Sequence, residues 1–408
     1  MVQLAIIADD LTGALDTGVK FVKSGNNIQI FCSGSLDKEQ IEESTNVIVI
    51  DTETRHVSPN EAYNVVFKII KNCEEAGIKY FYKKTDSALR GNIGSELAAL
   101  HDALNKQVEF IPALPREGRI TKQGIQYING IEVGKSIFAK DPINPVKHSY
   151  IADIIHEQTD LDVSCSFEKA DDGDIVVFDA ETEEDLNKIT NIINQQNKLG
   201  AIAGCSGYAE YLPQLINLKS TQRQNIPKTD KLFVISGSIN KITLDQLDFA
   251  EQNGIKRLTL NSEQKLLTNY FDTTSGQLFF SNLSNQCRIN KQLIIDVGEK
   301  DNSILEVAND LHLSINEIPT RIAFRISEIF KNIVNLNLDV TILITGGDTL
   351  FAAIKSISPD TIKLIGEVIP GAVLIHVIIE GKTIQIVSKS GGFGNKDMII
   401  ELGNVILK

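Results

Sequence analysis

Two adjacent aspartates, Asp9 and Asp10, follow the first apolar segment of the chain and could carry out acid–base chemistry. The segment 2–8 is apolar enough to form a buried strand, and a helical pattern of apolar residues follows at 14–22. Open α/β sheets bind ligands at the carboxyl ends of their strands, where these carboxylates would stand. Asp10 or Thr12 could simply cap the helix, but a cap needs only one such residue. The doublet therefore predicts a functional site at this turn.

A second turn follows the strand expected at 78–82 and combines cations, a carboxylate and hydroxyls. Arginine suits bidentate binding of carboxylate or phosphate, and lysine suits a point-charge contact. A third turn, 112–119, adds arginines, although its prolines could be there only to form the turn. These charges could also face water, but they follow buried strands and are interleaved with Thr, Ser and Gly. The residues expected to bind an acidic substrate here are Lys83, Lys84, Asp86, Arg90 and Arg119.

Three glycine-rich turns stand out in the second half, at 236–238, 345–349 and 388–394. Each follows an expected strand and precedes a helix, so each would present backbone N–H groups to an anion. A tight turn that needs a positive φ would explain any one of them. Three in one domain, one beside a lysine, favour a polyphosphate such as ATP. The residues expected to bind it are Ser236, Gly237, Ser238, Gly346, Gly347, Asp348, Thr349, Lys389, Gly391 and Gly392.

Other nucleotide motifs are absent from the sequence. The segment 130–136 resembles a Walker A loop but has three residues between its glycines where the motif needs four. No G-x-G-x-x-G follows a strand, which disfavours a dehydrogenase, and no G-x-S-x-G elbow surrounds Cys205. A nucleotide site in this chain is therefore expected to be of a different design.

Composition narrows the class of protein. The chain has 408 residues, 42% of them hydrophobic, and a net charge of −13, which argues against nucleic acid or an anionic membrane as partner. Its five cysteines are scattered and its six histidines lack metal-site spacing. No apolar run is long enough to span a membrane and no signal peptide is visible, so a cytoplasmic protein is expected.

The order of strand-like and helix-like stretches predicts an α/β fold of two domains. Each domain is expected to hold a mainly parallel sheet flanked by helices, with the active site in the cleft between them. The polar segment 212–231, with two prolines, is the expected linker. The predicted domains are 1–220, for substrate, and 230–408, for nucleotide. Hairpins are expected around Asn129-Gly130 and Glu380-Gly381.

Taken together, these motifs resemble the four-carbon acid sugar kinase family. The segment 8–14 with Asp16 is similar to the first signature of the family, 83–92 to its second, and 111–121 to its third. The glycine turns are similar to those of its nucleotide-binding domain. The resemblance runs in order from residue 3 to about residue 400.

This resemblance implies an ATP-dependent kinase that phosphorylates the terminal hydroxyl of threonate, erythronate or 3-oxo-tetronate, with Mg²⁺ as a further cofactor. It adds Asp16 to the expected substrate-binding residues. Asp9 or Asp10 would orient or deprotonate the hydroxyl, and the sequence does not separate their roles. Asp348 could reach Mg²⁺ or only cap its helix, so the metal ligands stay open.

A rival interpretation is a non-catalytic sensor that binds a sugar acid and a nucleotide. It predicts stabilisation by ligands without turnover. The aspartate doublet and the cation-rich turn exceed what anion binding alone requires, which favours the kinase. A homodimer is expected only because two-domain cytosolic enzymes are often dimers.

Overall fold

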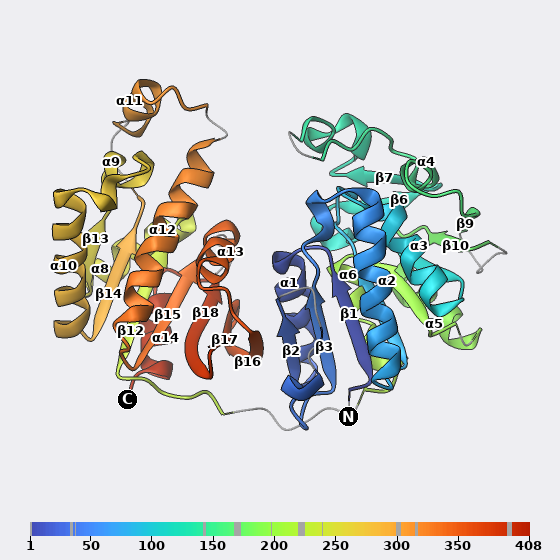
Figure 1. Ribbon diagram of the computed structural model, residues 1–408, viewed down its shortest axis with the longest axis horizontal. Coiled ribbons are helices and arrows are strands. Elements are labelled where there is room, and N and C mark those ends of the chain that lie inside the picture. The colour runs from blue at the N-terminus through green and yellow to red at the C-terminus, as the bar shows by residue number, and fades with distance from the viewer. Residues whose placement is uncertain are drawn as a thin grey trace. The chain divides into compact units, whose positions relative to one another are not determined.

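The computed structural model describes residues 2–32, 36, 38–141, 144–166, 173–196, 198–218, 225–238, 240–298, 303–314, 317–389 and 394–408. The chain divides into two compact units, Met1–Gln222 and Arg223–Lys408, coloured blue to green and yellow to red in Figure 1. Two glycines predicted to bind nucleotide, Gly391 and Gly392, lie outside the described residues, as does the side chain of Asp348.

The first unit is built on a parallel sheet with helices on both faces (Figure 1). In spatial order its strands are β2 (Ile28–Phe31), β3 (Val47–Asp51), β1 (Leu4–Ala8), β4 (Tyr80–Lys84), β11 (Ala201–Gly204), β5 (Val108–Ile111), β10 (Ile175–Phe178) and β9 (Val163–Ser166). Its helices are α1 (Leu11–Lys23), α2 (Pro59–Glu75), α3 (Ile93–Leu104), α4 (Ile151–His156), α5 (Glu183–Gln195), α6 (Ser206–Ala209) and α7 (Leu212–Leu215).

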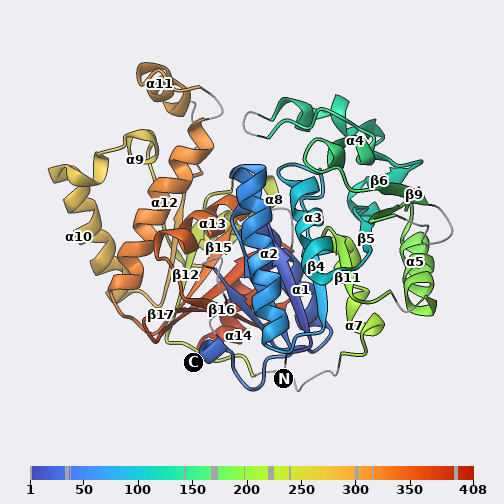
Figure 2. The same ribbon diagram turned by 45° about the vertical axis from the view of Figure 1, so that its right-hand side comes forward.

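Short local signals start the helices that cover this sheet. Helix α2 begins with the Ser58 side chain as N-cap and Pro59 in its first turn, and a stripe of residues from Ala62 to Cys73 is buried. That stripe joins apolar residues of α3, α4 and one sheet face in a single core. Figure 2 shows α2 and α3 side by side over the strands. The prediction of a parallel sheet flanked by helices is confirmed for this unit.

A small antiparallel sheet, of β6 (Arg119–Lys122), β7 (Ile125–Ile128) and β8 (Ile131–Glu132), lies apart from the main sheet in the same unit. The predicted hairpin is confirmed, since Asn129 and Gly130 both have positive φ, at 50° and 80°. The 3₁₀ turn η4 (Val133–Lys135) follows β8 where a Walker A loop would need an α-helix. The segment is therefore a hairpin and a turn.

The second unit is also α/β. In spatial order its strands are β13 (Lys256–Thr259), β14 (Gln292–Asp296), β12 (Lys231–Ser236), β15 (Val340–Thr345), β18 (Lys382–Lys389), β17 (Ala372–Ile379) and β16 (Thr361–Ile369). The first five are parallel and β17 is antiparallel to both neighbours. The helices are α8 (Lys241–Gln252), α9 (Ser262–Leu266), α10 (Thr274–Ile289), α11 (Ser303–Asp310), α12 (Glu317–Asn335), α13 (Gly347–Ser356) and α14 (Met398–Ile406).

The sequence anticipates only part of this unit, since the helices α9, α10 and α11 were not among the elements it predicted. The hairpin at Glu380-Gly381 is confirmed and joins β17 to β18. The helix expected directly after the turn at 388–394 begins at Met398. Strand β16 was not expected, because its pattern is broken by irregular pairing between Leu364 and Gly366 and again before Ile369.

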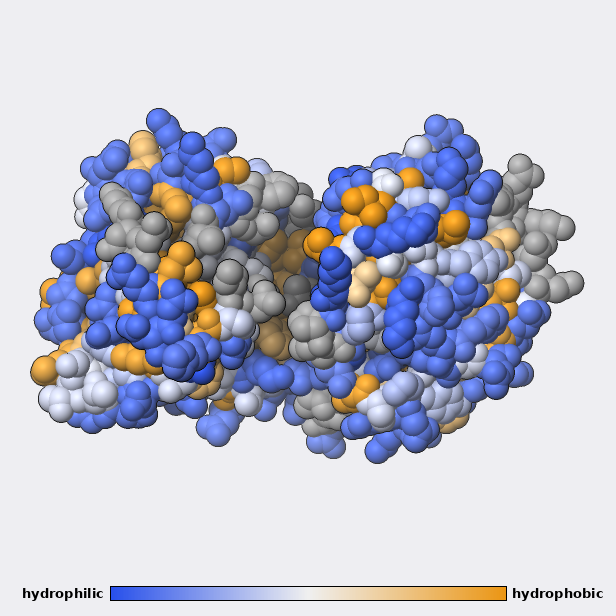
Figure 3. All heavy atoms as spheres, turned by 90° about the horizontal axis from the view of Figure 1, so that it is seen from above, coloured by the Kyte–Doolittle hydropathy of each residue, from blue (hydrophilic) through white to orange (hydrophobic). Residues whose placement is uncertain are grey.

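The face of the molecule drawn in Figure 3 is mixed in character. Seen from above in Figure 3, hydrophilic residues predominate over both units and hydrophobic ones are scattered among them. No helix among the described residues is long and apolar enough to cross a membrane.

Candidate active site

Three neighbouring parallel strands of the first unit end together. Ala8 of β1 pairs in register with Asp51 of β3 on one side and with Lys84 of β4 on the other. The polar turns that follow these strands therefore meet at one edge of the sheet. Asp10 also caps α1, because its Oδ1 accepts a hydrogen bond of 2.8 Å from the Gly13 N–H.

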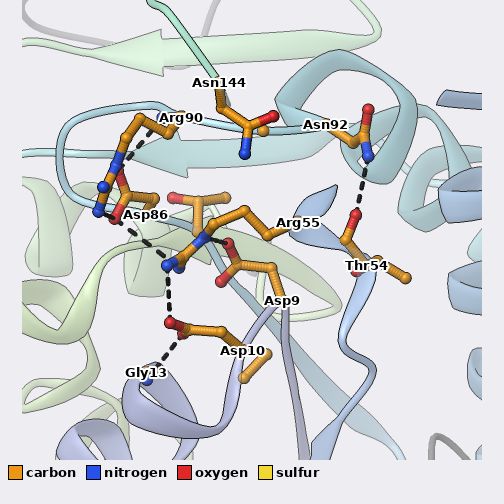
Figure 4. Close-up of polar contacts among 12 residues, drawn as sticks. Asp9, Asp10, Gly13, Thr54, Arg55, Asp86, Arg90, Asn92 and Asn144 are labelled. Carbon is orange, nitrogen blue, oxygen red and sulfur yellow. Dashed lines mark hydrogen bonds and ion pairs between the residues drawn. The ribbon is translucent and has the colours of Figure 1, made fainter. Parts of the chain in front are cut away.

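An arginine that the sequence analysis missed lies at the centre of this edge. Arg55 belongs to the 3₁₀ turn η2 (Thr54–His56) after β3. Its Nε lies 2.7 Å from Asp9 Oδ2 and its Nη1 lies 2.6 Å from Asp10 Oδ2 (Figure 4). Its Nη2 lies 3.7 Å from Asp86 Oδ1. The signal for Arg55 was the polar run 51–55 at the end of an expected strand, the same pattern as at the other two turns.

The two aspartates of the doublet have different environments. Asp9 is 2% exposed, and burial alone would raise its pKa, but three neighbouring cations, Arg55 first, hold the pKa below its usual value. The Asp10 side chain is 23% exposed. Asp9 is therefore a buried partner of Arg55, whereas Asp10 is open to a ligand.

A third carboxylate adjoins the doublet. Asp51, at the end of β3, is buried and accepts a hydrogen bond of 3.1 Å from the Glu53 N–H. Burial raises its pKa to about 7, and the charges of Glu53, Asp10 and Asp9 add to the shift.

Asp86 and Arg90, both expected to bind substrate, are paired with each other. Arg90 Nε and Nη2 donate to the Asp86 carboxylate at 2.9 and 3.0 Å (Figure 4). Arg90 also reaches Asp141 at 3.2 Å. Burial acts to raise the pKa of Asp86, yet the bonds from Arg90 and the charge of Arg55 hold it well below the usual range. Asp9, Asp10, Arg55, Asp86 and Arg90 form one group, hereafter the charge cluster.

The two adjacent lysines differ in what holds their ammonium groups. Lys83 is fully buried and forms an ion pair of 2.9 Å with Glu96. Lys84 Nζ donates to the Thr85 carbonyl at 2.8 Å, and no described carboxylate lies within ion-pair distance of it. A Cβ atom at position 13 would lie 2.7 Å from Lys84 Nζ and 2.6 Å from Asp10 Oδ1. The Lys84 ammonium and the Asp10 carboxylate therefore flank the same glycine.

Two further predicted residues stand outside the charge cluster. Asp16 is exposed on α1, and Arg119 pairs with Glu117 at 2.8 Å. Within the described part of the chain, no hydrogen bond or ion pair joins either to the charge cluster. A cavity of about 270 Å³ adjoins the charge cluster at Arg90, Asn92 and Asn144.

In the second unit, the three glycine turns follow adjacent parallel strands. Ser236 of β12 is in register with Thr345 of β15, and Thr345 with Lys389 of β18. The turns at 236–238 and 345–349 therefore lie side by side, and the described part of the third begins beside them. Burial lowers the pKa of Lys389 to about 8.

Close packing explains two of the glycines. A Cβ atom at position 237 would lie 2.0 Å from Thr349 Oγ1, so a larger residue would displace that side chain. Gly346 has φ +106°, which few other residues adopt. The buried hydroxyls of Ser236 and Thr345 have no hydrogen-bond partner within the described residues. The turns that follow β12 and β15 therefore offer backbone N–H groups and buried hydroxyls to a ligand.

One buried acid at the same edge is already satisfied. Asp296 of β14 is in register with Ser236 but binds Arg257 at 2.7 and 3.2 Å and accepts a bond from Thr259 at 3.1 Å. Among the described residues no group of three His, Cys, Asp or Glu side chains is placed to hold a metal ion.

Two family models match the chain, one within each of its two compact units. Residues 4–212 match the family described as the sugar-binding N-terminal domain, and residues 233–399 match the nucleotide-binding C-terminal domain.

Several relatives and solved structures are similar over nearly the whole chain. A D-threonate kinase of Salmonella typhimurium is 26% identical over 98% of this chain and 97% of its own. A D-erythronate kinase of Heliobacterium modesticaldum is 26% identical over 97% and 95%. A 3-oxo-tetronate kinase of Escherichia coli is 31% identical over 39% of this chain and 42% of its own. A solved structure from Haemophilus influenzae has the same fold, with a TM-score of 0.78 at 20% identity over 99% of this chain and all of its own. The chain belongs to the four-carbon acid sugar kinase family, and it is a phosphotransferase with an alcohol group as acceptor.

Proposed function

We propose that this chain is an ATP-dependent kinase that phosphorylates the terminal hydroxyl of a four-carbon sugar acid. The observation that carries the proposal is the pairing of Asp10, 23% exposed, with Arg55 at 2.6 Å beside the Lys84 ammonium. One edge of the sheet thus offers an accessible carboxylate for a hydroxyl and cations for a carboxylate. Relatives named as D-threonate and D-erythronate kinases, similar over nearly the full chain, support the substrate class.

Asp10 is the residue we assign to the acceptor hydroxyl. Phosphoryl transfer depends mostly on positioning and charge stabilisation, and a carboxylate that accepts the hydroxyl proton orients the nucleophile. Asp9 is too buried for this role and instead holds the Arg55 guanidinium.

The substrate carboxylate is assigned to Lys84 and Arg55. Lys84 is a buried ammonium whose hydrogen bond goes to a neutral carbonyl, so a carboxylate would gain a charge-assisted bond there. Lys83 is committed to Glu96, which makes it a positioning residue. Direct substrate contact by Asp16 and Arg119 stays a prediction.

The glycine turns of the second unit fit a nucleotide. Ser236, Gly237 and Ser238 lie beside Gly346, Gly347 and Thr349, and the partnerless hydroxyls of Ser236 and Thr345 are suited to phosphate oxygens. Lys389 would add positive charge. When bound, ATP would supply the phosphoryl group, and this chain's residues would hold its phosphates and exclude water.

A Mg²⁺ ion bound together with the ATP phosphates would need few ligands from the protein. This ion keeps several waters and is usually held by substrate phosphates and one or two carboxylates. Asp348 is the carboxylate proposed for it. The position of the active site between the two domains stays a prediction.

An ADP-release assay with Mg-ATP tests the proposal against D- and L-threonate, D- and L-erythronate and the corresponding 3-oxo acids. Turnover on one acid, absent without acid and strongly reduced in Asp10→Asn, is the expected result. Thermal stabilisation by ATP and by an acid without turnover on any of them would overturn the proposal in favour of a binding protein.

A further inference from the structure

Glu96 is a buried carboxylate outside the charge cluster, and its two partners are sequence neighbours of residues at that cluster. Glu96 lies in α3 and is 1% exposed, among apolar neighbours such as Ile93 and Leu97. A carboxylate in such a place is costly unless it is paired and hydrogen-bonded. Its partners are the Lys83 ammonium, at 2.9 Å, and the Thr54 hydroxyl, which donates to Glu96 Oε1.

Thr54 is the residue immediately before Arg55 in the 3₁₀ turn η2. The turn starts strained, because Glu53 before it has φ +48°, a region that non-glycine residues rarely adopt. A 3₁₀ turn of three residues has poor hydrogen-bond geometry of its own, so contacts from neighbouring segments help to hold it.

The segment that opens α3 supplies these contacts. The Asn92 amide donates to the carbonyls of Thr54 and Val57 at 2.8 and 2.9 Å, one on each side of Arg55, and the bond to Thr54 is drawn in Figure 4. A Cβ atom at Gly91 would lie 3.1 Å from the Arg55 carbonyl oxygen, so the backbones pack closely. Glu96 adds a further contact to the Arg55 turn, because it accepts the hydrogen bond of the Thr54 hydroxyl.

The same carboxylate is tied to the strand that carries the aspartates. Lys83 Nζ, paired with Glu96, also donates to the Ile7 carbonyl at 3.3 Å and the Lys84 carbonyl at 2.8 Å. The ends of β1 and β4 and the Arg55 turn are thereby joined at one buried point.

We propose that Glu96 is a positioning residue of the kinase, which acts by fixing the Arg55 turn through Thr54 so that the guanidinium meets both aspartates. The inference rests on the proposed function. Glu96 does not touch the substrate in this role, because its side chain is buried and bound to Thr54.

A matched pair of variants at Thr54 tests this without removing a buried charge. Thr54→Val keeps the shape and removes the hydroxyl, whereas Thr54→Ser keeps the hydroxyl. Wild-type turnover on a four-carbon acid is established first, so failure of the proposed function is seen separately. We expect Thr54→Val to lower kcat/KM for the acid about tenfold or more, with KM for ATP unchanged, and Thr54→Ser to stay near wild type.

A double-mutant cycle shows whether the effect passes through Arg55. In an Arg55→Ala background, Thr54→Val should have little further effect, because the group it positions is gone. Glu96→Gln should lower kcat/KM for the acid in the same direction, with KM for ATP again unchanged. Equal losses in both backgrounds, or a loss in Thr54→Ser as large as in Thr54→Val, would overturn the proposal.

Discussion

Two sheet edges, one in each unit, carry the candidate binding residues, and their side chains differ in chemistry. In the first unit, Asp9, Asp10 and Asp86 surround Arg55, and each charge has a partner of opposite sign. In the second unit, the turns after β12 and β15 offer glycine backbone and two buried hydroxyls without partners. The turns of the first edge are rich in paired side-chain charge, whereas the residues 236–238 and 345–347 of the second are uncharged.

This difference matches what each edge is proposed to bind. Paired charges hold carboxylates and guanidinium groups in fixed directions before a ligand arrives, which suits a small acid whose hydroxyl must be oriented. Neutral N–H donors at strand ends and helix N-termini suit polyphosphates of high charge. The comparison therefore predicts that substitutions in one edge affect one substrate selectively.

The largest effect is expected for Asp10→Asn. Asparagine can still cap α1, so the fold should remain, but the proposed base is lost and kcat should fall about 10²- to 10⁴-fold. Affinity for ATP should change little. Steady-state kinetics with both substrates check this, with Asp153→Asn on the exposed face of α4 as control. A normal kcat would remove Asp10 from the chemistry.

A smaller effect is expected for Lys84→Met, which removes the ammonium beside Asp10 and keeps the length of the side chain. KM for the sugar acid should rise about 10- to 100-fold, the value of a hydrogen bond to a charged group. KM for ATP should stay the same. Lys79→Met, an exposed position just before β4, is the matched control. Equal rises in both KM values would contradict the comparison.

Gly237→Ala tests nucleotide binding at the sheet edge of the second unit. The new Cβ would lie 2.0 Å from Thr349 Oγ1, so the turn must move, and KM for ATP should rise about tenfold. KM for the acid should hold. Gly366→Ala is the control, because a Cβ there meets no atom within 4 Å. An unchanged KM for ATP would place the phosphates elsewhere.

The smallest effect concerns pH. Burial lowers the pKa of Lys389 to about 8, so the ammonium is charged below that pH and loses its charge above it. KM for ATP should therefore rise a few-fold between about pH 7 and pH 9. Lys389→Arg, which stays charged throughout, should flatten this profile. A pH profile that is the same in wild type and Lys389→Arg would exclude the lysine from nucleotide binding.

Much of the architecture followed from the sequence, because its signals are local. Apolar runs such as 2–8 and 341–344, each broken by a polar turn before a helical pattern, predicted parallel sheets with ligands at the strand ends. Asn129-Gly130 predicted its hairpin because both residues tolerate positive φ. Strand β16 was not predicted, because its bulges disturb the alternation of apolar and polar residues that indicates a strand.

The sequence by itself determined which residue types stand at the strand ends, since the patterns that predict strands and turns are local. It predicted that Asp9, Asp10 and Lys84 belong to one site, and the structure brings these three side chains close together. Only the tertiary structure decided which charges meet. Arg55 and Glu96 were recognised only in the structure. They belong to the turn after β3 and to α3, which are distant in sequence and are brought together by sheet pairing and core packing. A buried charge needs a partner because its desolvation is costly. Which segment of the chain supplies that partner depends on the tertiary structure.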